Sequence, residues 1–257
     1  IKENDFAMIM GFPGSTNRYY TSWEVKQRRD VDNTIRINMR GIRQKEMLDE
    51  MLADPKVRIQ YASKYARSSN YWKNSIGMNR GINKLKVIEN KELDEARFKV
   101  WANDNNHPEY IQALNDMRDA TLQMNDIKYQ YYMLLEALYQ GVEFSGVPAR
   151  NKKLIEALEH KNDSIIKYAQ SVIQKMIDLR KELKPINEKF ALAKQTYIKG
   201  LLEMNPGKPA YPDANFTIRA TYGQVLPYSP SDGIDYHYYT TLKGVMEKED
   251  PNNWEFV

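Results

Sequence analysis

One short polar and aromatic stretch carries side chains suited to binding a charged ligand. Residues 68–74 read Ser-Ser-Asn-Tyr-Trp-Lys-Asn. The side-chain oxygens of Asn70 and Asn74 are acceptors of the kind that a free ammonium group requires, and the rings of Tyr71 and Trp72 would exclude bulk water beside them. The two asparagines are four residues apart and would share one face of a helix. The alternative is that the aromatic rings pack in a core and the asparagines bond to neighbouring helix ends.

The rest of the chain offers little catalytic chemistry. It has no cysteine, which excludes disulfides, thiol nucleophiles and cysteine-based metal sites. His107, His160 and His237 stand in none of the spacings typical of a metal site, so we expect no metal and no cofactor. No Gly-x-Ser-x-Gly motif marks a nucleophilic serine, and Ser15 follows a proline-containing turn that is typical of a connector. Nothing in the sequence therefore marks a nucleophile, although a Ser-His-Asp triad assembled from distant residues stays geometrically possible.

Prolines divide the middle of the chain into segments with the pattern of helices. Each of four prolines stands where a helix would begin, because proline is tolerated in the first turn. They are Pro55, Pro108, Pro148 and Pro185. Asp54, and either Asn106 or His107, are placed to cap the helices that follow the first two. We predict helices over residues 22–53, 55–82, 85–102, 108–140, 149–183 and 185–204.

Apolar residues recur every three or four positions in the two longest later segments. The first stripe includes Ile111, Leu114, Met117, Thr121, Met124, Ile127 and Leu134, and the second includes Leu154, Leu158, Ile165, Val172, Met176, Leu179 and Leu183. This period favours long amphipathic helices packed as an antiparallel bundle or hairpin. Residues 141–147 would then be the hairpin turn.

The two ends of the chain have the pattern of strands. Residues 6–10 form a short apolar run that favours a buried strand, and the Gly-Phe-Pro-Gly of residues 11–14 ends it with a turn. Alternation with a period of two predicts a second strand over 215–225, and residues 239–247 favour a short helix. A strand-like start, a long helical middle and a strand-like return are typical of an insertion into a larger β domain.

Four segments resemble, in the same order, bacterial serine dipeptidyl-peptidases of serine peptidase family 46, of the dipeptidyl-peptidase 7 and 11 type. They are GFPGSTNRYYTS (11–22), SSNYWKNSIGMNRG (68–81), NFTIRATYGQV (215–225) and YYTTLKGVMEKEDPNNWEFV (238–257). The resemblance spans the whole chain and implies a chymotrypsin-like double β-barrel with a large helical domain inserted between its lobes. Residues 1–14 would be the last strand of the first lobe, 15–205 the inserted helical domain and 206–257 the beginning of the second lobe.

The resemblance also implies an activity, the release of dipeptides from the free N-terminus of an oligopeptide. In this family the catalytic His and Asp precede the GFPG segment and the nucleophilic Ser follows the tail, so the chain by itself would be inactive. The helical domain would act as a lid and contribute an asparagine to the substrate's α-ammonium group. We favour Asn70 over Asn74, with aromatic support from Trp72. The resemblance implies that the parent protein is periplasmic, cell-surface or secreted, and it is compatible with a homodimer.

Composition leaves two other functions open. Charged residues make up 28% of the chain, its mean hydropathy is −0.72, and no apolar run approaches the roughly 18 residues of a membrane span. The net charge is +4. A helical adaptor module would bind protein partners without the barrels, whereas a basic nucleic-acid-binding domain would bind DNA with a strong salt dependence. The acids interspersed among the lysines and arginines argue against nucleic acid.

Overall fold

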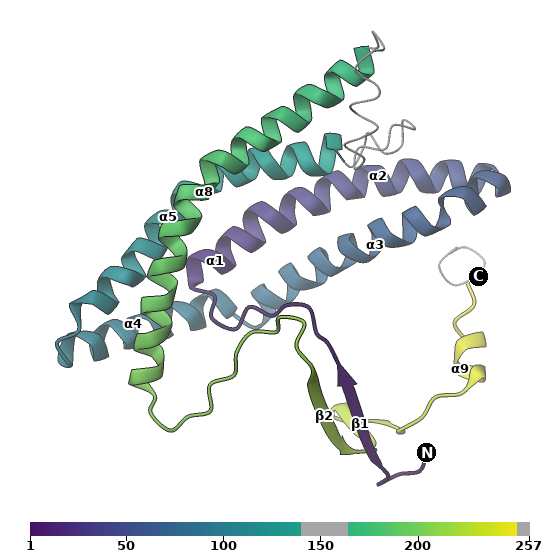
Figure 1. The fold of residues 1–257 in the computed structure, drawn as a ribbon. Coiled ribbons are helices and arrows are strands. Elements are labelled where there is room, and N and C mark those ends of the chain that lie inside the picture. The colour runs from purple at the N-terminus through teal and green to yellow at the C-terminus, as the bar shows by residue number, and fades with distance from the viewer. Residues whose placement is uncertain (140–163, 251–257) are drawn as a thin grey trace. The chain divides into compact units, whose positions relative to one another are not determined.

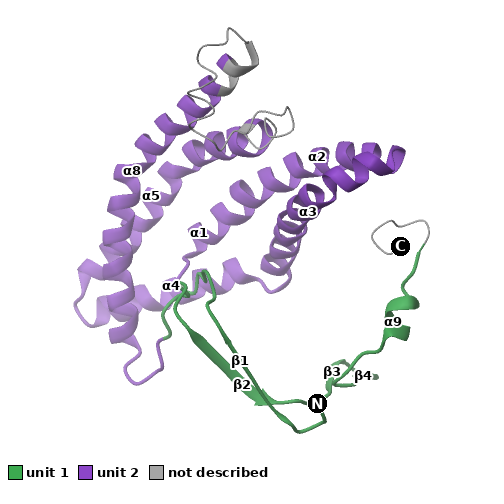
Figure 2. Ribbon diagram, turned by 45° about the vertical axis from the view of Figure 1, so that its right-hand side comes forward, with its two compact units in different colours: residues 1–18, 211–257 green, residues 19–210 purple. Residues whose placement is uncertain are grey.

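The computed structural model describes residues 1–139 and 164–250, and the chain divides into two compact units (Figure 2). Residues 19–210 form the first, which we call the helical unit. Residues 1–18 together with 211–257 form the second, which we call the strand unit. Each unit therefore has its own packing, and the two ends of the chain belong to the same unit.

The helical unit is built from long helices packed in pairs. Its first helical run comprises α1 (Ser22–Gln27), the π-helical segment η1 (Arg28–Asn33) and α2 (Thr34–Ala53). It continues with α3 (Pro55–Lys84), α4 (Val87–Asp104), α5 (Pro108–Met133), the π-helical segment η2 (Leu134–Tyr139) and α8 (Ser164–Met204). Figure 1 shows α2 beside α3 and α5 beside α8, so these four helices form two antiparallel pairs.

The predicted helix starts at Ser22, Pro55 and Pro108 are confirmed. Thr21 accepts a hydrogen bond from the Glu24 backbone, and the Glu24 carboxylate accepts one from the Thr21 backbone at 2.9 Å, which is a capping box. Asp54 caps α3 through the Lys56 N–H at 2.8 Å. His107 stands at the N-cap position of α5 but makes no capping bond, because its Nδ1 lies 2.9 Å from Glu109.

The predicted helix break at Pro185 is wrong, because α8 continues through this residue. Proline removes one helical hydrogen bond and costs about 3 kcal/mol or more in a helix interior. Leu183 and Ile186, on either side of it, pack against Ala120 and Met124 of α5. This packing favours a continuous helix over the local preference of proline. The predicted turn at 141–147 and the start of the predicted helix 149–183 lie outside the described residues.

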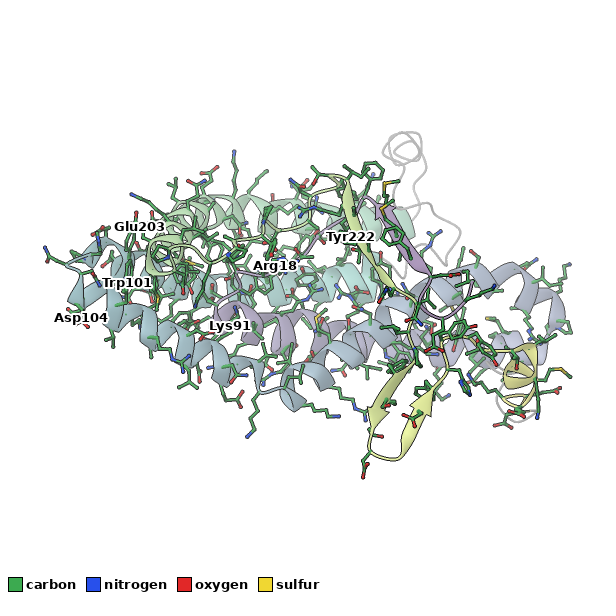
Figure 3. The ribbon with its side chains drawn as sticks, turned by 90° about the horizontal axis from the view of Figure 1, so that it is seen from below. Arg18, Lys91, Trp101, Asp104, Glu203 and Tyr222 are labelled. Carbon is green, nitrogen blue, oxygen red and sulfur yellow. The ribbon has the colours of Figure 1, made fainter. Side chains whose placement is uncertain are left out.

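The main core lies where α4, α5 and α8 meet. Its buried residues are Phe98, Ala102, Tyr110, Leu114, Met117, Ala193 and Tyr197. The first predicted apolar stripe is confirmed at Leu114, Met117 and Met124 of α5, which are buried, and the second at Leu179 of α8. The part of the second stripe before residue 164 lies outside the described residues. Figure 3 shows Trp101 and Glu203 at this end of the helical unit. The Tyr110 hydroxyl donates to Glu203 at 2.5 Å, and this hydrogen bond raises the pKa of Tyr110 to about 12.

The described residues of the strand unit form two short antiparallel ribbons. β1 (Phe6–Gly11) pairs with β2 (Arg219–Gln224) over six residues, from Phe6 opposite Gln224 to Gly11 opposite Arg219. β3 (Tyr228–Ser231) pairs with β4 (Ile234–Tyr236). The predicted helix near residues 239–247 is confirmed as the shorter α9 (Leu242–Met246). Segments more than 200 residues apart are thus joined by one ladder.

Two strand predictions need correction. The second strand begins at Arg219 rather than at residue 215, because Phe216 has a φ of 63°, which interrupts extended backbone. The Phe216 ring instead packs beside Gly14, and the backbone N–H of Phe216 donates to the Pro13 carbonyl at 3.0 Å. The first strand is not buried, since its apolar side chains, such as Phe6 and Ile9, are exposed in this chain.

The fold class is therefore mainly helical, with short antiparallel strands from the two ends of the chain. The predicted insertion into a double β-barrel, and the assignment of 1–14, 15–205 and 206–257 to first lobe, helical domain and second lobe, stay predictions.

Candidate functional site

The helix α3, which carries Asn70 and Asn74, is held against the preceding helical run by polar contacts along its length. The Gln44 side chain donates to the Tyr65 carbonyl at 3.4 Å, and the Trp72 indole N–H donates to the Ile37 carbonyl at 3.0 Å. Further along, Asn33 donates to the Asn79 side chain at 2.7 Å. Hydrogen bonds are directional, so these contacts set the rotation of α3 about its own axis.

This rotation leaves the two asparagines of the candidate site facing outward. Asn70 and Asn74 are both exposed, whereas Ser68, Ser69 and Ser75 are buried in the interface. The side chains of Asn70 and Asn74 make no hydrogen bond within the described part of the chain. Four residues of separation place them on one face of α3, one turn apart. The structure therefore brings these two acceptors together on an accessible helix face.

Trp72 is not beside the asparagines. It lies on the side of α3 that faces α2, where it is half-buried and bonded to the Ile37 carbonyl. A Cβ added at Gly41 of α2 would lie 3.5 Å from the Trp72 indole nitrogen, so this ring packs close to the α2 backbone. The Tyr71 ring is half-exposed and carries the Arg40 guanidinium 5.1 Å from its centroid. Trp72 thus supports the helix from within, and a role at the substrate stays a prediction for all three residues.

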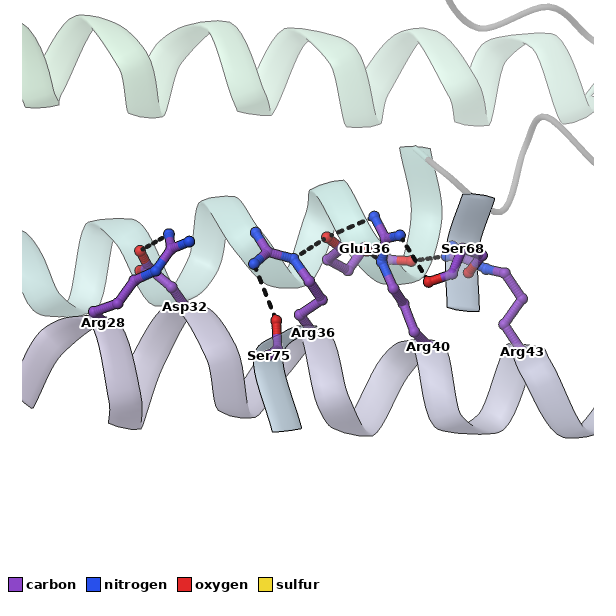
Figure 4. A network of polar contacts seen from close by, with 8 residues as sticks. All are labelled: Arg28, Asp32, Arg36, Arg40, Arg43, Ser68, Ser75 and Glu136. Atoms are coloured by element: carbon purple, nitrogen blue, oxygen red, sulfur yellow. Dashed lines mark hydrogen bonds and ion pairs between the residues drawn. The ribbon is translucent and has the colours of Figure 1, made fainter. Parts of the chain in front are cut away.

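A buried carboxylate beneath this stretch was missed by sequence reasoning. Glu136 of η2 is 2% exposed and accepts from Arg40 at 2.8 and 3.2 Å and from Arg36 at 3.2 Å (Figure 4). The Arg43 guanidinium donates to the Glu136 backbone carbonyl. A charged carboxylate is costly to bury unless paired in this way. The spacing of Arg36, Arg40 and Arg43 on one helix face was the available sequence signal.

A second buried polar cluster lies between η1 and α5, around a cavity of about 90 Å³. Asp32 pairs with Arg28 at 3.2 Å and faces Lys128. Burial raises the pKa of Asp32 above its ordinary 3.8, although Lys128 and Arg28 oppose that shift. Burial likewise lowers the pKa of Lys128, which donates to Gln27. The cluster ties the first helical run to α5.

The described residues add two negative findings. Across residues 1–139 and 164–250, no group of three His, Asp or Glu side chains is arranged to hold a metal ion. Nor does any helix of this part of the chain combine the length and the apolar character needed to cross a membrane.

A family model described as Peptidase S46 matches residues 1–159 and 135–257, which together span the whole sequence. The chain belongs to the peptidase S46 family. This agrees with the resemblance of the four segments.

Named relatives and a solved structure give the same result. A dipeptidyl-peptidase 7 of Phocaeicola vulgatus is 37% identical, and an Asp/Glu-specific dipeptidyl-peptidase of Porphyromonas gingivalis is 32% identical, each covering 100% of this chain and 49% of the relative. The crystal structure of Porphyromonas endodontalis DPP11 with the dipeptide Arg-Glu matches with a TM-score of 0.84 at 29% identity, over 100% of this chain and 50% of that one. The chain thus spans about half the length of the relatives that it matches.

Proposed function

We propose that the protein containing this chain is a serine dipeptidyl-peptidase that releases dipeptides from the free N-terminus of oligopeptides. Membership of the peptidase S46 family and the dipeptidyl-peptidase names of its relatives support this activity. The catalytic triad would lie outside the chain, so the chain alone is expected to be inactive. A periplasmic, cell-surface or secreted location and a homodimeric parent belong to the same proposal.

The helical unit is proposed to cover the substrate and to anchor its α-ammonium group through Asn70 or Asn74. The observation that carries this proposal is the pair of exposed amide side chains on one face of α3, with that helix fixed from behind by polar contacts. An ammonium group donates three hydrogen bonds, and amide oxygens are suitable acceptors. Anchoring the amino terminus sets the register, so that the second peptide bond reaches the nucleophile.

Charge pairing on the surface favours this proposal over nucleic-acid binding. Exposed lysines pair with neighbouring acids, as Lys26 does with Glu92 at 2.6 Å and Lys45 with Asp49 at 2.9 Å. Binding to nucleic acid requires basic side chains that replace the counterions of its phosphates. Lysines that already pair with acids are less available for this.

The test is steady-state kinetics of Asn70→Ala and Asn74→Ala in the full-length enzyme with free-amino dipeptidyl substrates. A charge-assisted hydrogen bond contributes about 1.5–3 kcal/mol, so loss of the anchoring asparagine should lower kcat/KM at least about tenfold. Melting temperatures should not change, because both side chains are exposed. Asn103→Ala, an exposed asparagine on α4, is the matched control and should keep full activity. Wild-type kcat/KM in both variants would exclude this stretch as the anchor.

A further inference from the structure

The same arginines that pair with Glu136 also contact the stretch of α3 that carries the asparagines. Arg40 donates to the Ser68 carbonyl at 3.3 Å and lies over the Tyr71 ring. Arg36 donates to the Ser75 hydroxyl at 3.3 Å. Ser68 and Ser75 bracket Asn70 and Asn74 along the helix (Figure 4 draws both serines). One buried carboxylate is therefore linked, through two side chains of α2, to both ends of the candidate site.

The orientation of these two arginines depends on the carboxylate. Arg40 makes two hydrogen bonds to Glu136, and the same guanidinium contacts the Ser68 carbonyl and the Tyr71 ring. Arg36 divides its hydrogen bonds between Glu136 and Ser75 in the same way. The guanidinium group is planar and its N–H donors have fixed directions. When some of these donors bond to Glu136, the directions of the remaining donors are therefore fixed as well. Removal of the negative charge would release both guanidinium groups, and the buried Arg40 and the partly buried Arg36 would then repel each other.

We propose that Glu136 is a positioning residue for the substrate's amino terminus, acting through Arg36 and Arg40 on the α3 segment that presents Asn70 and Asn74. This inference rests on the proposed function of those asparagines and names the tertiary contact that fixes their position. Glu136 is 96 residues from Arg40 in the sequence and belongs to a different helix pair. The precision of the anchor is thus set by η2, through a network that touches no substrate.

The size of the effect follows from how strongly rate depends on geometry. A displacement of about 1 Å at a substrate contact can cost on the order of 100-fold in rate. The contacts from Trp72 to Ile37 and from Gln44 to Tyr65 are independent of Glu136, so α3 keeps its place on α2 when the network is broken. A local shift of the 68–75 segment, rather than loss of the helix, is the expected consequence.

The test is a double-mutant cycle in the full-length enzyme between Glu136→Gln and whichever asparagine variant lowers activity. Glu136→Gln keeps the side-chain shape and removes the charge. In the wild-type background it should lower kcat/KM for free-amino dipeptidyl substrates by about fivefold to tenfold. In the asparagine-variant background it should change kcat/KM by less than about twofold, because its effect passes through that contact. Glu92→Gln, at an exposed ion pair, is the matched control and should have no effect in either background.

The outcomes separate this inference from the function on which it rests. If neither Asn70→Ala nor Asn74→Ala lowers activity, the anchor itself is excluded. If an asparagine variant loses activity but Glu136→Gln has no effect, or an equal effect in both backgrounds, only the positioning role is overturned. Should Glu136→Gln fail to fold, Ser75→Ala replaces it, because this variant removes the α3 acceptor of Arg36 and leaves the ion pairs intact. A Ser75→Ala effect that is absent or fully additive would likewise overturn the proposal.

Discussion

The carboxylate of Glu95 in α4 accepts two hydrogen bonds from Ser22, one from the backbone N–H at 2.5 Å and one from the hydroxyl at 2.8 Å. Ser22 is the first residue of α1, so this carboxylate satisfies a buried helix terminus from another helix. Burial raises the pKa of Glu95 above its ordinary value, although the Ser22 bonds oppose that shift.

Replacement of Glu95 by Ala should therefore destabilise the helical unit. The variant leaves the fully buried N–H and hydroxyl of Ser22 without their acceptor, which costs about 1–3 kcal/mol. Urea unfolding followed by circular dichroism measures the difference. Glu92→Ala on the same helix is the control, because its exposed pair with Lys26 should be worth less than about 1 kcal/mol. Equal losses in the two variants would contradict the structural role of Glu95.

Gly200 of α8 is predicted to tolerate no side chain. A Cβ at this position would lie 2.8 Å from Phe98 Cζ and 2.9 Å from Tyr110 Cγ, both in the main core. Gly200→Ala should destabilise the protein by about 1–3 kcal/mol through overpacking. Gly77→Ala in α3 meets nothing within 4 Å and should instead stabilise by about 0.5–1 kcal/mol. Thermal melts of both variants check this, and a stabilised Gly200→Ala would show that the α4–α5–α8 junction is looser than described.

Pro185 is predicted to weaken α8, although it does not end the helix. It is exposed, so its ring contributes little packing, and it leaves the Lys181 carbonyl without a helical donor. Pro185→Ala should raise the free energy of unfolding by about 1–3 kcal/mol. Pro55→Ala, at the first turn of α3, should instead lower it by at most about 1 kcal/mol, because no helical hydrogen bond is restored there. Denaturant unfolding that gives the same sign for both changes would contradict this account.

Asp32 is predicted to give the stability a distinct pH dependence. Its pKa in the folded state is raised above 3.8, so the folded protein takes up a proton at a higher pH than the unfolded chain does. Stability therefore rises as the pH falls from the raised pKa toward 3.8, and Asp32 adds no further change below that.

The measurement is the free energy of unfolding of the wild type and of Asp32→Asn between about pH 7 and pH 4. The wild type should gain stability relative to the variant as the pH falls through this window. Asp49→Asn, which alters an exposed pair with Lys45, should follow the wild type closely. If the wild type instead lost stability relative to Asp32→Asn on acidification, the pKa of Asp32 in the folded protein would be lowered rather than raised.

Local signals in the sequence predicted most of the helical unit. Asp54 with Pro55 marks the start of α3, and the spacing of Leu114, Met117 and Met124 marks the buried face of α5. These features act over one or two turns of backbone, so they can be recognised in the sequence without knowledge of the fold. That Asn70 and Asn74 share one face follows from the same helical period, whereas their outward direction depends on the contacts that hold α3 against α2.

Tertiary contacts decided the rest. The continuity of α8 through Pro185 depends on Leu183 and Ile186 packing against α5, and the direction of Trp72 depends on the Ile37 carbonyl of α2. The pairing of Glu136 with Arg40 joins residues 96 apart, and no local pattern specifies which distant acid meets which base. The sequence by itself determined most of the helices and the buried face of α5 because backbone preference and periodicity are local. Only the fold decided which faces meet, because burial and ion pairing depend on side chains that the chain brings together from a distance.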